Sequence, residues 1–183
     1  ITHANAYDVN GAGLGHVPED REKHGVVGAY SIADNLVLNC FDDEPYAVRG
    51  VRRFDAVREH AEALRTEFSI KSESVDSPVS SLSGGNKQKV VVAREMSAKP
   101  KVLVAAQPTR GVDVGSIEFI HRRIVEARDA GAAVLLVSAE LDEILSLADR
   151  VAVIHHGKNV AEMPAAGADR ALIGQLMAGG GSA

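Results

Sequence analysis

The spacing of apolar and polar residues follows two different patterns along the chain, and the pattern changes near residue 100. Beyond that point, short continuous apolar runs alternate with stretches in which apolar residues recur every three or four positions. Continuous runs predict strands covered on both faces, and the recurring pattern predicts amphipathic helices. The predicted strands are Val102–Ala106, Ala133–Val137 and Val151–Ile154, and the predicted helices span Ile117–Ala127, Leu141–Ala148 and Asp169–Met177.

The alternation of strands and helices predicts an α/β fold with parallel strand pairing and right-handed crossovers. A turn at His156-Gly157-Lys158 is expected to lead into a short edge strand, and Gly179–Ser182 is expected to form a frayed tail. The last part of the chain therefore reads as a repeating α/β core.

The first hundred residues are mostly helical in pattern. A short buried strand is predicted at Leu14–Val17, after a polar opening with neither a strand nor a helix cap. Apolar residues from Val51 to Phe68 recur at three- and four-residue steps, which predicts a surface helix with one apolar face. Residues 30–100 are therefore predicted to form a mostly helical unit inserted between strands.

Two polar segments precede that surface helix. Residues 19–23 are charged and predict a loop. Ser31 and Asp34 have the form of a capping box, which predicts a short helix through the apolar residues that follow.

A glycine pair lies at the predicted start of another helix, which runs from Leu82 to about Ser97. The first N–H groups of a helix have no internal partner, and glycine lets a ligand approach the backbone closely. Ser83, Gly84 and Gly85 therefore predict either an anion site or an ordinary N-cap. Lys87 and Lys89, further along, are expected to be solvated lysines on the helix surface.

Composition narrows the possible functions. The chain has 183 residues, of which 45% are hydrophobic, as in a soluble domain with room for a subdomain. No apolar run approaches the roughly 20 residues that span a bilayer. A net charge of −5 argues against nucleic acid as a partner. The single cysteine, Cys40, excludes an internal disulfide and is expected to be a buried structural thiol, and the histidines lack the spacing of metal ligands, so no metal site is predicted.

Several motifs in a fixed order resemble the ATP-binding-cassette (ABC) ATPase family. They are His16-Val17-Pro18-Glu19-Asp20-Arg21, Leu82-Ser83-Gly84-Gly85-Asn86-Lys87-Gln88-Lys89, and Gln107-Pro108-Thr109-Arg110-Gly111-Val112-Asp113. The chain is most similar to the C-terminal cassette of the tandem ATPases that serve simple-sugar and nucleoside importers. The resemblance implies a partial nucleotide-binding domain with a mostly parallel sheet and an inserted helical subdomain. It divides the chain into a start of the core (1–29), a helical signature subdomain (30–100) and an α/β core (101–183).

The resemblance also implies roles for individual residues. In this family two cassettes pair head to tail, and each signature covers the nucleotide held by the other. Asp113 matches an aspartate of the loop that crosses the dimer interface, although it could equally cap the following helix. The residues implied to contact nucleotide in trans are Ser83, Gly84, Gly85, Asn86 and Gln88.

Other family positions have lost their usual chemistry. Ala106 and Gln107 stand where the family has a magnesium-binding aspartate and a catalytic glutamate, and Ala139 replaces the switch histidine. Alanine cannot hold a metal, and a neutral amide cannot act as a carboxylate base. Glu19 stands at the glutamine-loop position, where it would repel phosphate unless Arg21 or magnesium compensates. No catalytic residue of the local site is therefore expected to be intact.

The phosphate-binding loop, G-x-x-x-x-G-K-[ST], is absent from the sequence, and Gly11-x-Gly13-x-Gly15 is predicted to be a flexible turn instead. We therefore expect a chain truncated before Ile1, with uncovered sheet surface that promotes self-association. It is expected neither to hydrolyse nor to hold ATP alone, whereas Mg-ATP is expected in the full complex.

The expected function is that of part of an importer ATPase at the inner face of the cell membrane. Its partners would be an N-terminal cassette and transmembrane permease subunits, the latter contacted through Glu19–Gly28 or Val51–Phe68. Two alternatives remain open from the sequence, namely an ABC ATPase without a membrane partner and a regulatory module that binds no nucleotide. The transported solute is not encoded in these residues.

Overall fold

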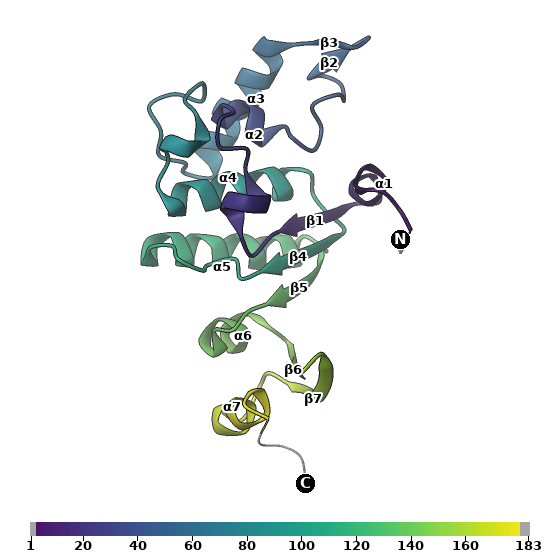
Figure 1. The fold of residues 1–183 in the computed structure, drawn as a ribbon, viewed down its shortest axis with the longest axis vertical. Helices are drawn as coiled ribbons and strands as arrows, with labels where there is room; N and C mark the ends of the chain where they lie inside the picture. Colours follow the sequence, from purple (N-terminus) through teal and green to yellow (C-terminus); the bar gives the residue numbers. More distant parts are fainter. Residues whose placement is uncertain (1–2, 180–183) are drawn as a thin grey trace. The chain divides into compact units, whose positions relative to one another are not determined.

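The computed structural model describes residues 3–179, and the chain divides after Leu135 into two compact units (Figure 1). The elements up to residue 106 are α1 (Ala6–Gly11), β1 (Leu14–Val17), a π-helical turn (Arg21–Gly25), α2 (Ile32–Leu36), β2 (Ala47–Val48), β3 (Val51–Arg52), α3 (Phe54–Glu67), a 3-10 turn (Val79–Ser81), α4 (Gly84–Ser97) and β4 (Val102–Ala106). The remaining elements are α5 (Val114–Asp129), β5 (Ala133–Val137), α6 (Leu141–Leu147), β6 (Arg150–His155), β7 (Lys158–Pro164) and α7 (Arg170–Met177).

The sheet of the first unit has the strand order β1-β4-β5. β1 pairs with β4 in parallel, from Leu14 opposite Val102 to Val17 opposite Ala105. The predicted parallel pairing and the strand at Leu14–Val17 are therefore confirmed. β1 and β4 are neighbours in the sheet, so the helical residues between them in the sequence form an insertion between two adjacent strands. Figure 1 shows α2, α3 and the β2-β3 hairpin outside the sheet.

α4 is the central helix of the first unit. It contacts β1, α2, α3 and α5, and the side chains of Val90, Val91, Val92 and Ala93 are completely buried. A helix with apolar residues on all sides is stable only when it is surrounded by other elements. The helix that begins at Ser83 is therefore held by packing along its length, and its predicted end at Ser97 is confirmed.

The strands are less covered than the sequence predicts. In β4, Leu103 and Ala105 are buried, whereas Val102 on the opposite face is exposed. In β5, Leu135 is 57% exposed and Val137 is exposed as well. Successive side chains of a strand point to opposite faces, so a continuous apolar run does not require that both faces be covered. The expectation of burial on both faces is therefore wrong for β4 and β5.

The predicted surface helix begins three residues later than its apolar pattern. Val51 lies in β3, and α3 starts at Phe54, whose side chain is 70% exposed. The buried face of α3 consists of Val57, Ala61 and Leu64. The pattern placed the start of the helix too early because Val51 fits its spacing by coincidence, whereas Phe54 lies in α3 but not on its buried face.

Three further local predictions concern two helix caps and the charged segment after Pro18. The opening segment does have a capped helix, because the Asn5 side chain accepts from the Asp8 N–H at the start of α1. The charged residues after Pro18 form a π-helical turn rather than a loop, with its N-terminus capped by Asp20. The capping role of Ser31 is confirmed, since its Oγ accepts from the N–H of Asp34 over 3.0 Å.

The second unit is built on an antiparallel pair. β6 pairs with β7 from Arg150 opposite Pro164 to His155 opposite Lys158, so the predicted strand after the turn is confirmed as the antiparallel partner of β6. Strands joined by a two-residue turn must run in opposite directions. His156 and Gly157 both have positive φ, which confirms the predicted turn. A small core forms around Val151, Val153 and Ile173, and residues 180–182 of the expected frayed tail lie outside the described residues.

Among the described helices, none has both the length and the apolar character that a membrane crossing requires. The thiol of Cys40, expected to be buried, is partly buried.

Candidate functional site

The start of α4 has the geometry of a capped helix N-terminus. Ser83 is in the extended region, and its Oγ lies 3.4 Å from the Asn86 N–H nitrogen and 3.0 Å from Asn86 Nδ2. The N–H groups of Gly84 and Gly85 have no partner within the helix, and the macrodipole makes this end partly positive. The N-cap role of Ser83 is confirmed, while an anion contact there stays a prediction.

Packing inside the same chain also constrains both glycines. A Cβ atom added to Gly84 would lie 2.8 Å from Nη2 of Arg21. A Cβ atom on Gly85 would lie 2.5 Å from Oδ2 of Asp113 and 2.7 Å from Oγ of Ser116. Real Cβ atoms do not approach other atoms this closely, so neither glycine can gain a side chain without displacing a neighbour.

The two amide residues of the motif have different positions. Oδ1 of Asn86 accepts from the Lys71 N–H over 2.8 Å, and Asn86 is half-buried at the helix start. Gln88 is only 2% exposed, and its Nε2 donates to the carbonyl of Pro108 over 2.8 Å. The side chain of Gln88 is therefore committed to the protein interior, which gives it a supporting role behind the helix start.

The two lysines of this helix are not solvated as expected. Nζ of Lys87 lies 2.9 Å from a carboxylate oxygen of Glu22. Lys89 is buried, donates to the carbonyl of Ser69 over 3.2 Å, and lies over the ring of Phe119. Burial lowers the pKa of Lys89, and the charge of Asp113 opposes that shift. The expectation of solvation is wrong because α4 is covered on nearly every side.

Asp113 caps α5. Its Oδ1 accepts from the Ser116 N–H over 3.0 Å, and its Oδ2 accepts from the Ser116 hydroxyl over 2.8 Å. Hydrogen bonds from the Ser116 side chain and backbone hold the pKa of Asp113 below its ordinary value, so the carboxylate is charged at neutral pH. The capping role is confirmed, and a role across a dimer interface stays a prediction.

Arg110, not Arg21, pairs with the carboxylate of Glu19, which is predicted to occupy the glutamine-loop position. Glu19 forms an ion pair with the Arg110 guanidinium. The Arg21 guanidinium instead donates to two carbonyls, that of Arg110 over 2.7 Å and that of Gly111 over 3.2 Å. Sequence reasoning missed the role of Arg110 because the two residues lie on different loops, which meet only in the fold.

The three positions predicted to have lost hydrolytic chemistry, Ala106, Gln107 and Ala139, lie in different parts of the chain. Ala106 ends β4, and Gln107 follows it with a φ of 49°. Ala139 belongs to the second unit, between β5 and α6. A methyl group and a neutral amide at the end of β4 do not fit a magnesium ion, which binds carboxylates through oxygen. Within residues 3–179, no three His, Cys, Asp or Glu side chains are close enough together to hold a metal ion.

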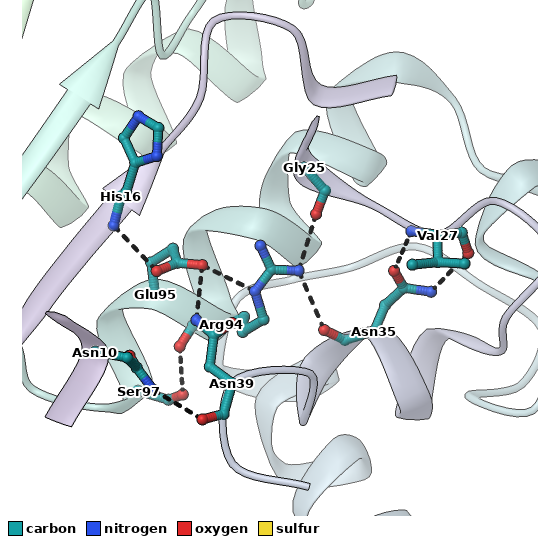
Figure 2. Close-up of polar contacts among 9 residues, drawn as sticks. All are labelled: Asn10, His16, Gly25, Val27, Asn35, Asn39, Arg94, Glu95 and Ser97. Carbon is teal, nitrogen blue, oxygen red and sulfur yellow. Dashed lines mark hydrogen bonds and ion pairs between the residues drawn. The ribbon is translucent and has the colours of Figure 1, made fainter. Parts of the chain in front are cut away.

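A buried polar network holds the far end of α4, and sequence reasoning missed it as well. Figure 2 shows Arg94 donating to the carbonyls of Gly25 and Asn35 and to the carboxylate of Glu95. The other oxygen of Glu95 accepts from the His16 N–H of β1 over 3.0 Å. Charged residues beside an apolar run were the only signal in the sequence, and their partners are far away along the chain.

The sequence matches the ABC transporter family over residues 5–110, which is more than half of the chain. It is 44% identical over 168 residues to the guanosine import ATP-binding protein NupO of Bacillus subtilis, covering 92% of this chain and 33% of that protein. It is 41% identical over 180 residues to the nucleoside import ATP-binding protein NupA of Lactococcus lactis, covering 98% and 36% respectively. The chain thus spans about a third of the length of these relatives.

The fold resembles solved ATP-binding cassettes. A dimeric cassette in a post-hydrolysis state, bound to ADP and Pi, superposes with a TM-score of 0.72 at 18% identity, over 89% of this chain and 68% of that one. A nucleotide-free cassette from an ABC transporter gives a TM-score of 0.70 at 22% identity, over 90% and 66%. At these identities the likeness concerns the fold alone, and it confirms the predicted α/β class.

Proposed function

This chain belongs to the ABC transporter family, and we propose that it is part of the ATP-binding subunit of an importer for nucleosides or sugars. Relatives named as import proteins for guanosine, nucleosides and glucose support this assignment. ATP with magnesium would be the nucleotide of the full complex.

The observation that carries the proposal is the contrast between the start of α4 and the end of β4. Ser83 is exposed and caps a helix whose first N–H groups are suited to a phosphate. Ala106 and Gln107, by contrast, cannot hold magnesium or activate water. We therefore propose that Ser83, Gly84 and Gly85 contact the γ-phosphate of ATP held by an N-terminal cassette of the same subunit, and that Asp113 lies at the interface between the two cassettes.

The order of the strands and helices suggests how the chain is divided into subdomains. We propose that residues 1–29 and 101–183 belong to the nucleotide-binding core and that residues 30–100 form the helical signature subdomain. The adjacency of β1 and β4 in one sheet supports this proposal, because the helical residues lie between these strands in the sequence.

Transmembrane permease subunits would be the second partner, placing the subunit at the inner face of the membrane. The proposed docking surface is in the helical subdomain, where Tyr30, Phe41 and Phe54 are exposed. Large apolar side chains at a surface favour contact with another protein. The acidic net charge of −5 does not favour nucleic acid as an alternative partner.

The test is a substitution at the exposed cap in the subunit that carries this chain, assembled with its permease. Ser83→Arg places a bulky cation at the helix start and is expected to lower ATP hydrolysis roughly 100-fold, because the phosphate contact is blocked. Ser80→Arg is the matched control, since Ser80 is exposed on the preceding turn and outside the proposed contact. Unchanged hydrolysis in Ser83→Arg would reject the contact in trans.

A regulatory module that binds no nucleotide is the second candidate, and the substitutions at Ala106 and Gln107 favour it. The ATP hydrolysis assay of Ser83→Arg distinguishes the two candidate functions. A regulatory module would tolerate Ser83→Arg, whereas a module that completes an ATP site would not. Calorimetry on this chain alone is expected to show no micromolar binding of Mg-ATP in either case.

A further inference from the structure

Three segments that lie far apart in the sequence meet at the side chain of Arg21. The first is the π-helical turn Arg21–Gly25, the second is the start of α4, and the third is the loop 107–113 between β4 and α5. The Arg21 guanidinium uses both terminal nitrogens on the third segment, with Nη1 2.7 Å from the Arg110 carbonyl and Nη2 3.2 Å from that of Gly111. A planar guanidinium is suited to this forked contact, because its donors are held in a fixed arrangement.

The same guanidinium lies against the second segment. A Cβ atom on Gly84 would be 2.8 Å from Nη2 of Arg21 and 3.5 Å from the Gly111 carbonyl. Gly111 has a φ of 65°, a conformation that glycine adopts without strain. The first residue of α4 is therefore in close contact with a guanidinium whose hydrogen bonds all go to the loop 107–113.

Other contacts join the same two segments. Gln88 donates to the Pro108 carbonyl over 2.8 Å. The side chains of Asp113 and Ser116 lie so close to Gly85 that a Cβ atom there would collide with them. The π-helical turn itself is attached to α4 at two points. Lys87 pairs with Glu22 over 2.9 Å, and Arg94 donates to the Gly25 carbonyl over 2.8 Å, as Figure 2 shows for Arg94.

From this geometry we infer that Arg21 is a positioning residue, which holds the phosphate-contacting start of α4 and the Asp113 loop in one fixed arrangement. The inference rests on the proposed function, because it assigns Arg21 to the support of the Ser83–Gly85 contact. Because both terminal nitrogens of Arg21 donate to carbonyls of the loop 107–113, we do not assign Arg21 a contact with nucleotide. Arg21 fixes the direction of the N–H groups proposed to contact the phosphate. Misplaced donors stabilise the transition state less, and this loss exceeds their loss of binding to the ground state.

The first experiment measures hydrogen exchange in the subunit that carries this chain. The amides of Lys87 and Val112 are bonded to Ser83 and Thr109 over 2.9 and 3.3 Å, one on each segment. Arg21→Met is expected to accelerate exchange at both amides by roughly fivefold or more, because losing the bridge loosens both segments together. Lys158→Met removes a charge from an exposed position in β7, outside the proposed contacts, and is expected to change neither. Unchanged exchange at both amides in Arg21→Met would overturn the inference.

The second experiment separates positioning from general stability. In the assembled transporter, Arg21→Met is expected to lower kcat for ATP roughly 10- to 100-fold while KM changes less than about threefold. Arg21→Lys keeps the charge but cannot fork to two carbonyls, so it is expected to restore only part of kcat. Lys158→Met is the control and is expected to keep the wild-type kcat.

The outcomes distinguish this inference from the proposed function. Loss of hydrolysis in Ser83→Arg together with a wild-type kcat in Arg21→Met overturns the positioning role alone. Full rescue by Arg21→Lys also overturns it, because charge rather than the forked contact would then suffice. Unchanged hydrolysis in Ser83→Arg rejects the proposed function and with it the catalytic purpose of the bridge, while the exchange experiment still decides whether Arg21 joins the two segments.

Discussion

Arg94 and Glu95 are neighbours in the sequence and form a buried ion pair, with Nε and Oε1 2.8 Å apart and each side chain 6% exposed. The pair is not isolated. Arg94 also donates to the Gly25 carbonyl, and Glu95 also accepts from the Asn39 amide over 3.0 Å. Because these partners come from different segments, the pair ties the end of α4 to the residues on either side of α2.

Removing one member of this pair leaves the other charged and buried. Arg94→Met is expected to lower the free energy of unfolding by about 3–5 kcal/mol, because the Glu95 carboxylate loses its cation. Urea unfolding of the chain measures the loss. The double variant Arg94→Met/Glu95→Gln is expected to lose less than the sum of the single losses. Additive losses would show that the two side chains are not coupled.

Two glycines give a matched pair of substitutions. Gly85→Ala is expected to lower the free energy of unfolding by about 1–3 kcal/mol, because the new methyl group would collide with the hydrogen-bonded Asp113 and Ser116. At Gly115 in α5 the nearest atom to an added Cβ is 3.5 Å away, so Gly115→Ala is expected to be neutral or to stabilise by up to about 1 kcal/mol. Equal thermal shifts for the two variants would contradict the packing argument.

The Cys40 thiol is expected to react slowly in the folded chain. Burial, followed by the charges of Asp43 and Asp42, raises its pKa from 9.0 to about 11. That shift lowers the thiolate fraction at pH 8 about 100-fold, and the thiolate is the reactive species. Labelling with an aromatic disulfide is therefore expected to be about 100-fold slower in buffer than in urea. The variant Asp43→Asn should recover a small part of the rate, and equal rates in buffer and urea would refute the shift.

His60 is expected to make stability depend on pH. It is half-buried beside Tyr46, with ring centroids 5.1 Å apart, and burial lowers its pKa below 6.5. The unfolded chain therefore binds the proton more tightly than the folded chain. The resulting stability is fully present above pH 6.5 and is lost as the pH falls towards the lower pKa of the folded state.

Urea midpoints at pH 7.5 and 5.5 measure this effect. The midpoint is expected to fall at the lower pH, and the fall is expected to be smaller in His60→Phe, which keeps the ring and removes the titrating group. An identical fall in the variant would assign the pH dependence to other groups.

Predictions from the sequence succeeded where a local rule decides the structure. Ser83 and Asp113 are polar residues directly before helices, and both cap them. The strand Leu14–Val17 was likewise bounded by a glycine and a proline. Val51 and Phe54 show where the approach fails, because helical spacing alone cannot say which apolar residues become buried.

The candidate site likewise has features that follow from local sequence and features that depend on the fold. The sequence alone determined its motifs, their order, the lack of a carboxylate at Ala106 and Gln107, and the capped start of α4, because each depends on residue type and on near neighbours. The tertiary structure decided that Arg110 neutralises Glu19, that Gln88 faces inward, and that Arg21 joins α4 to the loop before α5. These contacts connect residues that are far apart along the chain, and only folding brings such residues within hydrogen-bonding distance.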